Sequence, residues 1–301
     1  MRKFILYIVC GLISCSAFAQ QTPLYSMYMF NEFAVNPAVT SLQTYTKAQV
    51  NNRYQFVGIE NAPITATITL TGKIKTHPMG WGGMIYNDSQ GAFSKFGVYG
   101  GYSYCLKTGR NSKLALGLSI GLIRYSVDMT KIRFLEEETN LNESLYSSIR
   151  PDATFGIYYK FRRYFIGVSA DQLFNNQIDM YDDTLAVDNT LNRFKSHLNI
   201  MLGTEYKITR NFISESSIVA RKVYASPWQI EVSTRVTYRK SLWGGLSYRT
   251  EDAVVLFLGY TYRDMISFGY AYDITYSKLN AGSHGSHEAF LSIKFNSDEV
   301  K

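Results

Sequence analysis

The chain has 301 residues and a formal net charge of +7; 15% of its residues are aromatic and only 18% are charged. After the first residues no run of about 18 apolar residues occurs, so no transmembrane helix is expected. The basic residues are scattered and form no patch interleaved with aromatics, which argues against a nucleic-acid partner. No change of composition marks a linker after residue 45, so one large all-β unit is the simplest interpretation.

The N-terminus has the pattern of a secretory signal peptide, which we expect to cover residues 1–19. Two basic residues precede the short apolar run Phe4–Ile13, and Ala17–Ala19 fits the small-x-small cleavage pattern. Cleavage there makes Gln20 the first residue of the mature chain. The alternative is lipoprotein processing, with Cys15 as the lipidated residue.

The next stretch, Gln20–Gln43, shows no clear periodicity. It carries several methionines and phenylalanines and the turn-like Asn36-Pro37-Ala38. We predict a periplasmic N-terminal segment that is partly helical and packs at or inside the mouth of the β-structure formed by residues 44–301.

A strict alternation of apolar and polar residues runs through the rest of the chain. In Trp228–Arg239, apolar residues and one threonine occupy every second position and polar residues lie between them. Side chains alternate across a strand, so this pattern predicts a strand with one apolar and one polar face. The same pattern predicts fourteen strands: Lys47–Phe56, Ile64–Lys75, Met79–Asn87, Lys95–Leu106, Lys113–Ser126, Asp152–Phe161, Tyr164–Gln172, Lys195–Lys207, Phe212–Arg221, Trp228–Arg239, Leu242–Arg249, Ala253–Tyr262, Ile266–Asp273 and Glu288–Phe295.

The gaps between these strands distinguish a membrane barrel from a soluble sandwich. All even-numbered gaps are short, whereas the three long gaps, Val127–Pro151, Leu173–Phe194 and Ile274–His287, are odd-numbered. Up-and-down outer-membrane barrels have short periplasmic turns, long external loops and an even number of strands. We therefore predict an antiparallel transmembrane β-barrel whose apolar faces meet lipid, with the tyrosines supplying aromatic girdles.

A series of short motifs occurs in a fixed order along the mature chain. These are Asn36-Pro37-Ala38, Arg53-Tyr54-Gln55-Phe56, Ala62-Pro63, Asn87-Asp88-Ser89-Gln90-Gly91, Gly269-Tyr270-Ala271-Tyr272-Asp273 and Gly282-Ser283-His284-Gly285-Ser286-His287-Glu288. In order and spacing they resemble the PorP/SprF family of outer-membrane proteins of the type IX secretion system. The resemblance extends from about Gln21 to Phe295; Phe56, where the family usually carries Trp, is one departure.

The resemblance implies a function in protein export and in the surface display of cargo. It implies a non-enzymatic barrel in the outer membrane, in contact with its lipids, the periplasmic secretion ring and a peptidoglycan-associated lipoprotein. Some relatives serve one large surface adhesin, in some cases for gliding motility. A secreted cargo or adhesin is thus the expected external partner, and no cofactor is expected.

The motif residues also allow an interpretation from their own chemistry. Asn87, Asp88 and Gly91 favour an external turn over a ligand site, because these residue types tolerate tight-turn dihedrals. Arg53 and Gln55 are expected to point into the lumen, where Arg53 would pair with a carboxylate such as Glu205 or Glu231; substrate contact is the alternative. The full set of candidate lumen or loop-ordering residues is Asn36, Pro37, Arg53, Gln55, Pro63, Asn87, Asp88, Gly91, Asp273, His287 and Glu288.

The histidines near the last strand raise the question of a metal site. His284 and His287 have a spacing of three residues in a Gly/Ser loop, which suits neither a helix nor a strand ligand pair. We instead expect Glu288 to order this loop by accepting hydrogen bonds from its amides. The acidic external segments Glu136–Glu138 and Asp179–Asp188 are expected to be solvated, or to recognise cargo.

Two other classes of function remain open at this point. The first is a channel for small or hydrophobic solutes, plugged by the N-terminal segment. The second is an outer-membrane hydrolase, although the chain has no nucleophile elbow, P-loop, dinucleotide fingerprint or H-E-x-x-H helix.

Overall fold

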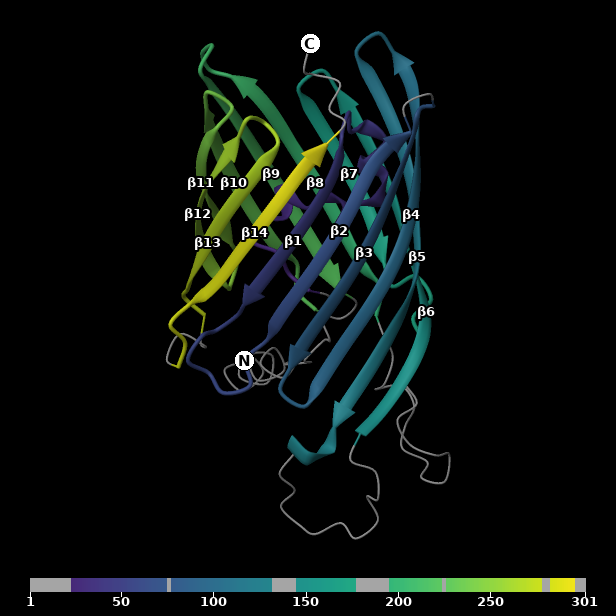
Figure 1. Ribbon diagram of the computed structural model, residues 1–301, viewed down its shortest axis with the longest axis vertical. Coiled ribbons are helices and arrows are strands. Elements are labelled where there is room, and N and C mark those ends of the chain that lie inside the picture. The colour runs from purple at the N-terminus through teal and green to yellow at the C-terminus, as the bar shows by residue number, and fades with distance from the viewer. Residues whose placement is uncertain are drawn as a thin grey trace, which may run out of the picture.

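The computed structural model describes residues 23–74, 77–131, 145–176, 195–223, 226–277 and 282–295. These residues form fourteen strands in a closed antiparallel barrel in which each strand pairs with its neighbours in the chain and β14 pairs with β1 (Figure 1). The predicted all-β barrel is confirmed. The strands are β1 Thr46–Tyr54, β2 Ile64–Ile74, β3 Met79–Gln90, β4 Phe93–Gly109, β5 Ser112–Asp128, β6 Leu145–Phe161, β7 Tyr164–Asp171, β8 His197–Lys207, β9 Phe212–Val223, β10 Gln229–Tyr238, β11 Leu242–Arg249, β12 Ala253–Tyr262, β13 Ile266–Thr275 and β14 Ser286–Phe295.

The helices of the described part are short 3-10 turns. They are η1 Tyr28–Phe30, η2 Glu32–Ala34, η3 Pro37–Leu42 and η4 Met129–Lys131. Across the residues that the structure describes, no helix has the length and apolar character needed to cross a membrane.

The outer surface of the barrel is apolar. On β10, Ile230 and Val232 are 40% and 47% exposed, whereas Glu231 between them is fully buried on the lumen side. The same alternation leaves Ile120 and Leu258 among the most exposed side chains. A cylinder with this exterior is solvated by lipid, because contiguous exposed apolar surface of this extent is rare on soluble monomers.

The two ends of the barrel differ in the length of their connections. Two to four residues join β4–β5, β6–β7, β8–β9, β10–β11 and β12–β13 at one end, which we call the short-turn end. The other end, the long-loop end, carries the extended β5–β6 hairpin that projects at the bottom of Figure 1. The short-turn end is assigned to the periplasm by the general asymmetry of such barrels.

The start of β6 differs from the prediction. The sequence predicted a start at Asp152, but β6 begins at Leu145 and includes Pro151, although proline usually interrupts a strand. Residues 145–154 pair only with β5, since pairing with β7 begins at Phe155. Pro151 therefore lies on an edge, where the missing N–H leaves no partner unpaired.

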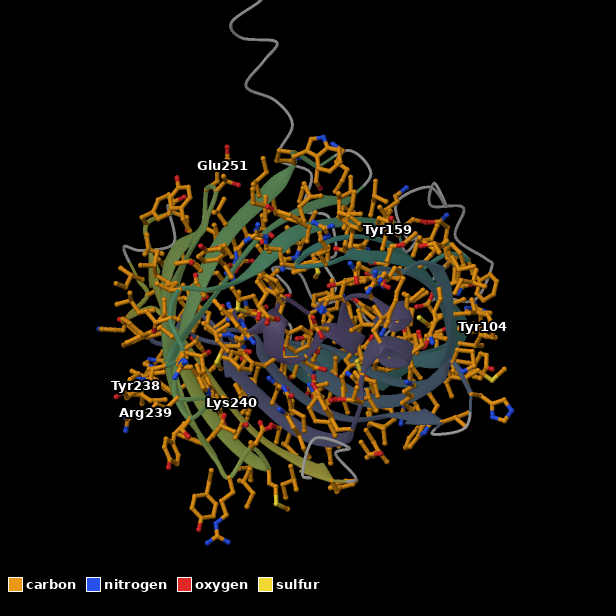
Figure 2. All side chains as sticks on the ribbon, turned by 90° about the horizontal axis from the view of Figure 1, so that it is seen from above. Tyr104, Tyr159, Tyr238, Arg239, Lys240 and Glu251 are labelled. Carbon is orange, nitrogen blue, oxygen red and sulfur yellow. The ribbon has the colours of Figure 1, made fainter. Side chains whose placement is uncertain are left out.

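The N-terminal segment, which we define as residues 23–45, lies inside the barrel. Figure 2 shows its purple turns within the ring of strands. Tyr25 contacts Thr67 near the start of β2, at the long-loop end, and the chain then runs to the short-turn end, where β1 begins at Thr46. The sequence predicted a segment at or inside the mouth; it occupies the lumen itself. The predicted signal peptide and Gln20 lie outside the described residues.

An apolar core lies inside this lumen. Met27, Tyr28 and Val39 of the segment pack with lumen-facing side chains of the strands, including Tyr158, Met201, Trp243, Phe257 and Phe290. The lumen is therefore not uniformly polar, and burial of this apolar surface holds the segment in place.

Candidate functional site in the barrel lumen

Three motif residues that are far apart in sequence meet near the long-loop end of the lumen. Arg53 pairs with Asp273 at 2.8 Å and with Glu288 at 3.1 Å, and all three side chains are at most 2% exposed. Arg53 and Glu288 are directly opposite in the β1–β14 register that closes the barrel. The prediction that Arg53 points into the lumen agrees with this geometry, but its partners are not Glu205 or Glu231.

This group of charges binds the N-terminal segment at Ser26. Glu288 accepts the backbone N–H of Ser26 at 2.6 Å and that of Met27 at 3.3 Å. The Ser26 hydroxyl lies 2.7 and 2.8 Å from the two carboxylate oxygens of Asp273 and also accepts a hydrogen bond from Arg53. Carboxylate bonds to backbone amides are among the stronger hydrogen bonds, so the start of the segment is fixed here.

A second arginine extends this group. Arg249 donates to Ser26 Oγ at 3.0 Å, to Glu231 at 3.3 Å and to Asp273 at 3.3 Å. Glu231 also pairs with Arg221 at 2.7 Å, and Arg249 with Asp252 at 2.9 Å. We call Arg53, Arg221, Arg249, Glu231, Asp252, Asp273 and Glu288 the lumen charge cluster. Its three arginines and four carboxylates nearly balance, as buried charges must.

The Asn-Pro-Ala motif fixes the segment against the opposite wall. Asn36 Nδ2 donates to the carbonyls of Ile157 and Val168 at 3.0 and 3.3 Å, and Asn36 Oδ1 accepts from the N–H of Ala38 at 3.0 Å. Asn36 thus caps η3, whose first residue is Pro37, a favourable position for proline.

Glycines in the wall make room for this close approach. A Cβ at Gly156 would lie 2.1 Å from Asn36 Oδ1, and one at Gly117 would lie 2.3 Å from the backbone nitrogen of Ala38. A Cβ at Gly80 would lie 2.3 Å from the nitrogen of Ser41. At these glycines the backbone of the wall lies directly against η3. Any side chain there would collide with η3, so only glycine allows this approach.

A cavity of about 510 Å³ lies between the segment and the short-turn end, and we call it the vestibule. Phe30 stands at its inner wall, with ring centroids 4.2 Å from Trp243 and 4.8 Å from Phe290 and the Arg235 guanidinium 4.5 Å above it. Glu32 lies in the segment rather than in a membrane-spanning strand, and burial, reinforced by Glu215, raises its pKa.

Other predicted residues lie apart from the lumen charge cluster. Gln55 follows β1 and bonds through its backbone to the carbonyl of Pro63 at 2.9 Å. Asn87, Asp88 and Gly91 were predicted to form a turn, but β3 continues to Gln90. Of these three only Gly91 lies in the turn, which it forms with Ala92 and where its φ is +59°. Asp88 instead accepts a 2.6 Å hydrogen bond from Thr65 in the neighbouring strand β2.

His284 and His287, the histidines near the last strand, lie on the outside of the barrel. His287 Nδ1 is 2.5 Å from the hydroxyl of Tyr270, whereas its neighbour Glu288 faces the lumen. His284 packs in the loop against the carbonyl of Val57. Among the described residues no group of three His, Cys, Asp or Glu side chains has the geometry of a metal site. Glu288 does accept backbone amides, but those of the N-terminal segment and not of its own loop.

Sequence reasoning missed Ser26 of the segment and three members of the lumen charge cluster, Arg221, Arg249 and Asp252. Arg249 lies on the lumen side of β11 by simple alternation, so the strand pattern contained the signal that could have found it. Ser26 lies in a stretch without periodicity, and no sequence signal marks it. The predicted cargo-recognition segments Glu136–Glu138 and Asp179–Asp188 lie outside the described residues.

A closed barrel with a lipid-facing exterior and a polar, plugged lumen defines an outer-membrane β-barrel protein. The sequence model of the family described as "Type IX secretion system membrane protein PorP/SprF" matches residues 17–293. The chain therefore belongs to the PorP/SprF family. No curated protein sequence gives a significant match.

Solved structures of outer-membrane channels are similar in fold. A TodX deltaS2S3 mutant, a monoaromatic hydrocarbon channel, is 10% identical, with 88% of this chain and 94% of that chain covered and a TM-score of 0.52. The Ralstonia pickettii toluene transporter TbuX is 9% identical, with 87% and 92% covered and a TM-score of 0.52. The monoaromatic hydrocarbon channel CymD is 10% identical, with 91% and 92% covered and a TM-score of 0.51. At this identity the likeness concerns the fold alone.

Proposed function

We propose that this protein is a non-enzymatic component of the type IX secretion system that supports export or cell-surface anchoring of cargo proteins such as adhesins, with gliding motility as one process served. The observation that carries the proposal is the family match over residues 17–293. The lumen supports the non-enzymatic part of the proposal, because the described residues that line the lumen bind the protein's own N-terminal segment.

The periplasmic side offers a defined contact surface for the secretion machinery. Phe30, Glu32 and Leu42 of the N-terminal segment line the vestibule together with the short turns. A periplasmic partner, either the secretion ring or a peptidoglycan-associated lipoprotein, would meet the segment there. Cargo would meet the long-loop end, through the connections between β5 and β6, β7 and β8, and β13 and β14.

The test is a deletion of the gene in the bacterium that carries it, followed by proteomics of the cell surface and the medium. We expect one or more secreted or surface-anchored proteins to disappear from the surface and to return on complementation. Outer-membrane proteins that use other routes serve as the control and should be unchanged. Normal display of every type IX cargo in the deletion strain would refute the proposal.

A second candidate is a channel for small or hydrophobic solutes, as in the aromatic-hydrocarbon channels of similar fold. Cavities on both sides of the segment favour it: the vestibule, and a pocket of about 70 Å³ lined by Tyr25, Tyr28 and Val223. The discriminating measurement is conductance or solute uptake in reconstituted bilayers. A barrel plugged by residues 23–45 should show neither, and steady conductance of the wild type would favour the channel.

A further inference from the structure

The short-turn end carries a ring of exposed arginines. They occur in five of the short turns, within the described residues, and we call them the arginine collar: Arg110, Arg162, Arg163, Arg210, Arg239 and Arg263. In the described parts of the chain none of the six pairs with a carboxylate, in contrast to the arginines of the lumen charge cluster. Their charge is therefore available to a partner outside the barrel.

Aromatic contacts hold several of these arginines on the outer side of the barrel. The guanidinium groups of Arg162, Arg239 and Arg263 lie 5.3, 5.2 and 5.2 Å from the ring centroids of Phe161, Tyr238 and Tyr262. Figure 2 shows Arg239 beside Tyr238 at the outer edge, with Lys240 closer to the lumen. Outward aromatic rings at a barrel end mark the membrane interface, so these arginines stand at the depth of lipid headgroups.

The backbone at these positions is unusual for arginine. Arg162, Arg239 and Arg263 have φ values of +53°, +49° and +48°. Tight hairpin turns of this left-handed kind favour glycine, asparagine or aspartate. Arginine therefore occupies a disfavoured backbone conformation at three equivalent turns, which indicates that its side chain has a role beyond forming the turn.

The densest part of the collar surrounds a concave site. A cavity of about 400 Å³ lies between the β6–β7 and β8–β9 turns and is lined by Lys160, Arg162, Arg163, Glu205, Tyr206 and Lys207. The Arg163 guanidinium lies over both Tyr164 and Tyr206, at 5.4 and 5.2 Å. Four cations face a single carboxylate here. The planar fork of arginine suits bidentate contacts to phosphate oxygens.

We propose that the arginine collar is a binding site for anionic phospholipid headgroups of the inner leaflet, centred on Arg162 and Arg163. An acidic protein surface is the competing partner. The aromatic contacts favour lipid, because they hold the guanidinium groups of Arg162, Arg239 and Arg263 against the outer wall. Arg163 also borders the vestibule, where a periplasmic protein would meet the segment. The proposal rests on the outer-membrane barrel and is independent of the role in secretion.

The test compares two variants that each remove two positive charges. Arg162→Gln/Arg163→Gln alters the collar, and Arg124→Gln/Lys131→Gln alters exposed residues toward the long-loop end. The full-length protein, purified in detergent, is titrated with phosphatidylglycerol or phosphatidylcholine, and bound lipid is measured by native mass spectrometry. Heat-modifiable gel mobility confirms that each barrel is folded.

An arginine at a membrane surface contributes about fivefold in affinity for anionic lipid, so the collar variant should bind phosphatidylglycerol roughly 25-fold more weakly. The control variant and phosphatidylcholine binding should change by less than about twofold, the latter because a zwitterionic headgroup has no net charge. Equal phosphatidylglycerol affinity in all three proteins would overturn the proposal. So would a collar variant that keeps its lipid affinity but loses an acidic periplasmic protein in pull-downs, since the collar would then be a protein-docking site.

Discussion

Replacing Arg53 by methionine should release the start of the N-terminal segment. The substitution keeps an unbranched side chain but removes the cation between Asp273 and Glu288, both nearly fully buried. Removing one partner of a buried ion pair costs about 3–5 kcal/mol, because the other charge stays buried without compensation. These two carboxylates hold Ser26 and Met27, so much of this cost falls on docking of the segment. Since about 1.4 kcal/mol is a factor of ten, opening should become roughly 100- to 3,000-fold more frequent.

Amide hydrogen exchange of the purified barrel in detergent measures this opening directly. In Arg53→Met, peptides covering residues 23–30 should lose protection while those of β3–β6 keep it. Arg210→Met, at an exposed turn, is the matched control and should leave all peptides unchanged. Adding Glu288→Gln to Arg53→Met should restore part of the protection, since the pair acts as a unit. Unaltered exchange of residues 23–30 in a folded Arg53→Met barrel would refute the idea that Arg53, with Asp273 and Glu288, holds the start of the segment.

Three further substitutions test other parts of the site. Gly117→Ala should weaken docking of η3 by about 1–3 kcal/mol through overpacking, measured as faster hydrogen exchange of residues 36–42. Gly100→Ala is the control and should leave this exchange unchanged, because nothing lies within 4 Å of the added Cβ. Asn36→Ala should cost about 1–2 kcal/mol through loss of the cap and of its bonds to the wall, measured as a lower temperature for protease cleavage within the segment. The raised pKa of Glu32 means that docking is most stable below the ordinary pKa of glutamate and loses stability as the pH rises through the raised value. Glu32→Gln should therefore protect residues 28–36 better at pH 8 than the wild type, and a pH-independent wild type would contradict this.

The strands were predictable because a membrane barrel repeats one physical rule at every position. Lipid on one side and a polar lumen on the other impose a period of two, and β10 follows it from Gln229 to Tyr238. The rule fails where the lumen holds protein. Trp243, Phe257 and Phe290 face inward and pack around the segment. Alternation places Trp243 on the same face of β11 as Arg249, but it does not show that protein rather than water fills the lumen beside it.

The candidate site was visible in the sequence only as separate pieces. Arg53, Asp273 and Glu288 each belong to a motif, but their meeting depends on the closure of β1 on β14, a contact between residues more than 200 positions apart. Once the pairing register of β1 and β14 is known, counting residues along the two strands places Arg53 opposite Glu288. Ser26 does not follow, because the position of an aperiodic segment depends on the shape of the whole lumen.

The contacts along the segment have different physical consequences. Apolar burial around Met27, Phe30 and Val39 supplies most of the stability of docking, because it removes hydrocarbon from water without a desolvation penalty. The lumen charge cluster adds little net stability for the opposite reason, since seven charges had to leave water to form it. The lumen charge cluster instead fixes the position of the segment, because any shift of Ser26 leaves buried carboxylates without their hydrogen bonds. The wall glycines fix the position of η3, because η3 fits only where no side chain projects from the wall. The geometry is therefore that of a segment held in one register, with its apolar residues packed against the strands and its polar start at the long-loop end.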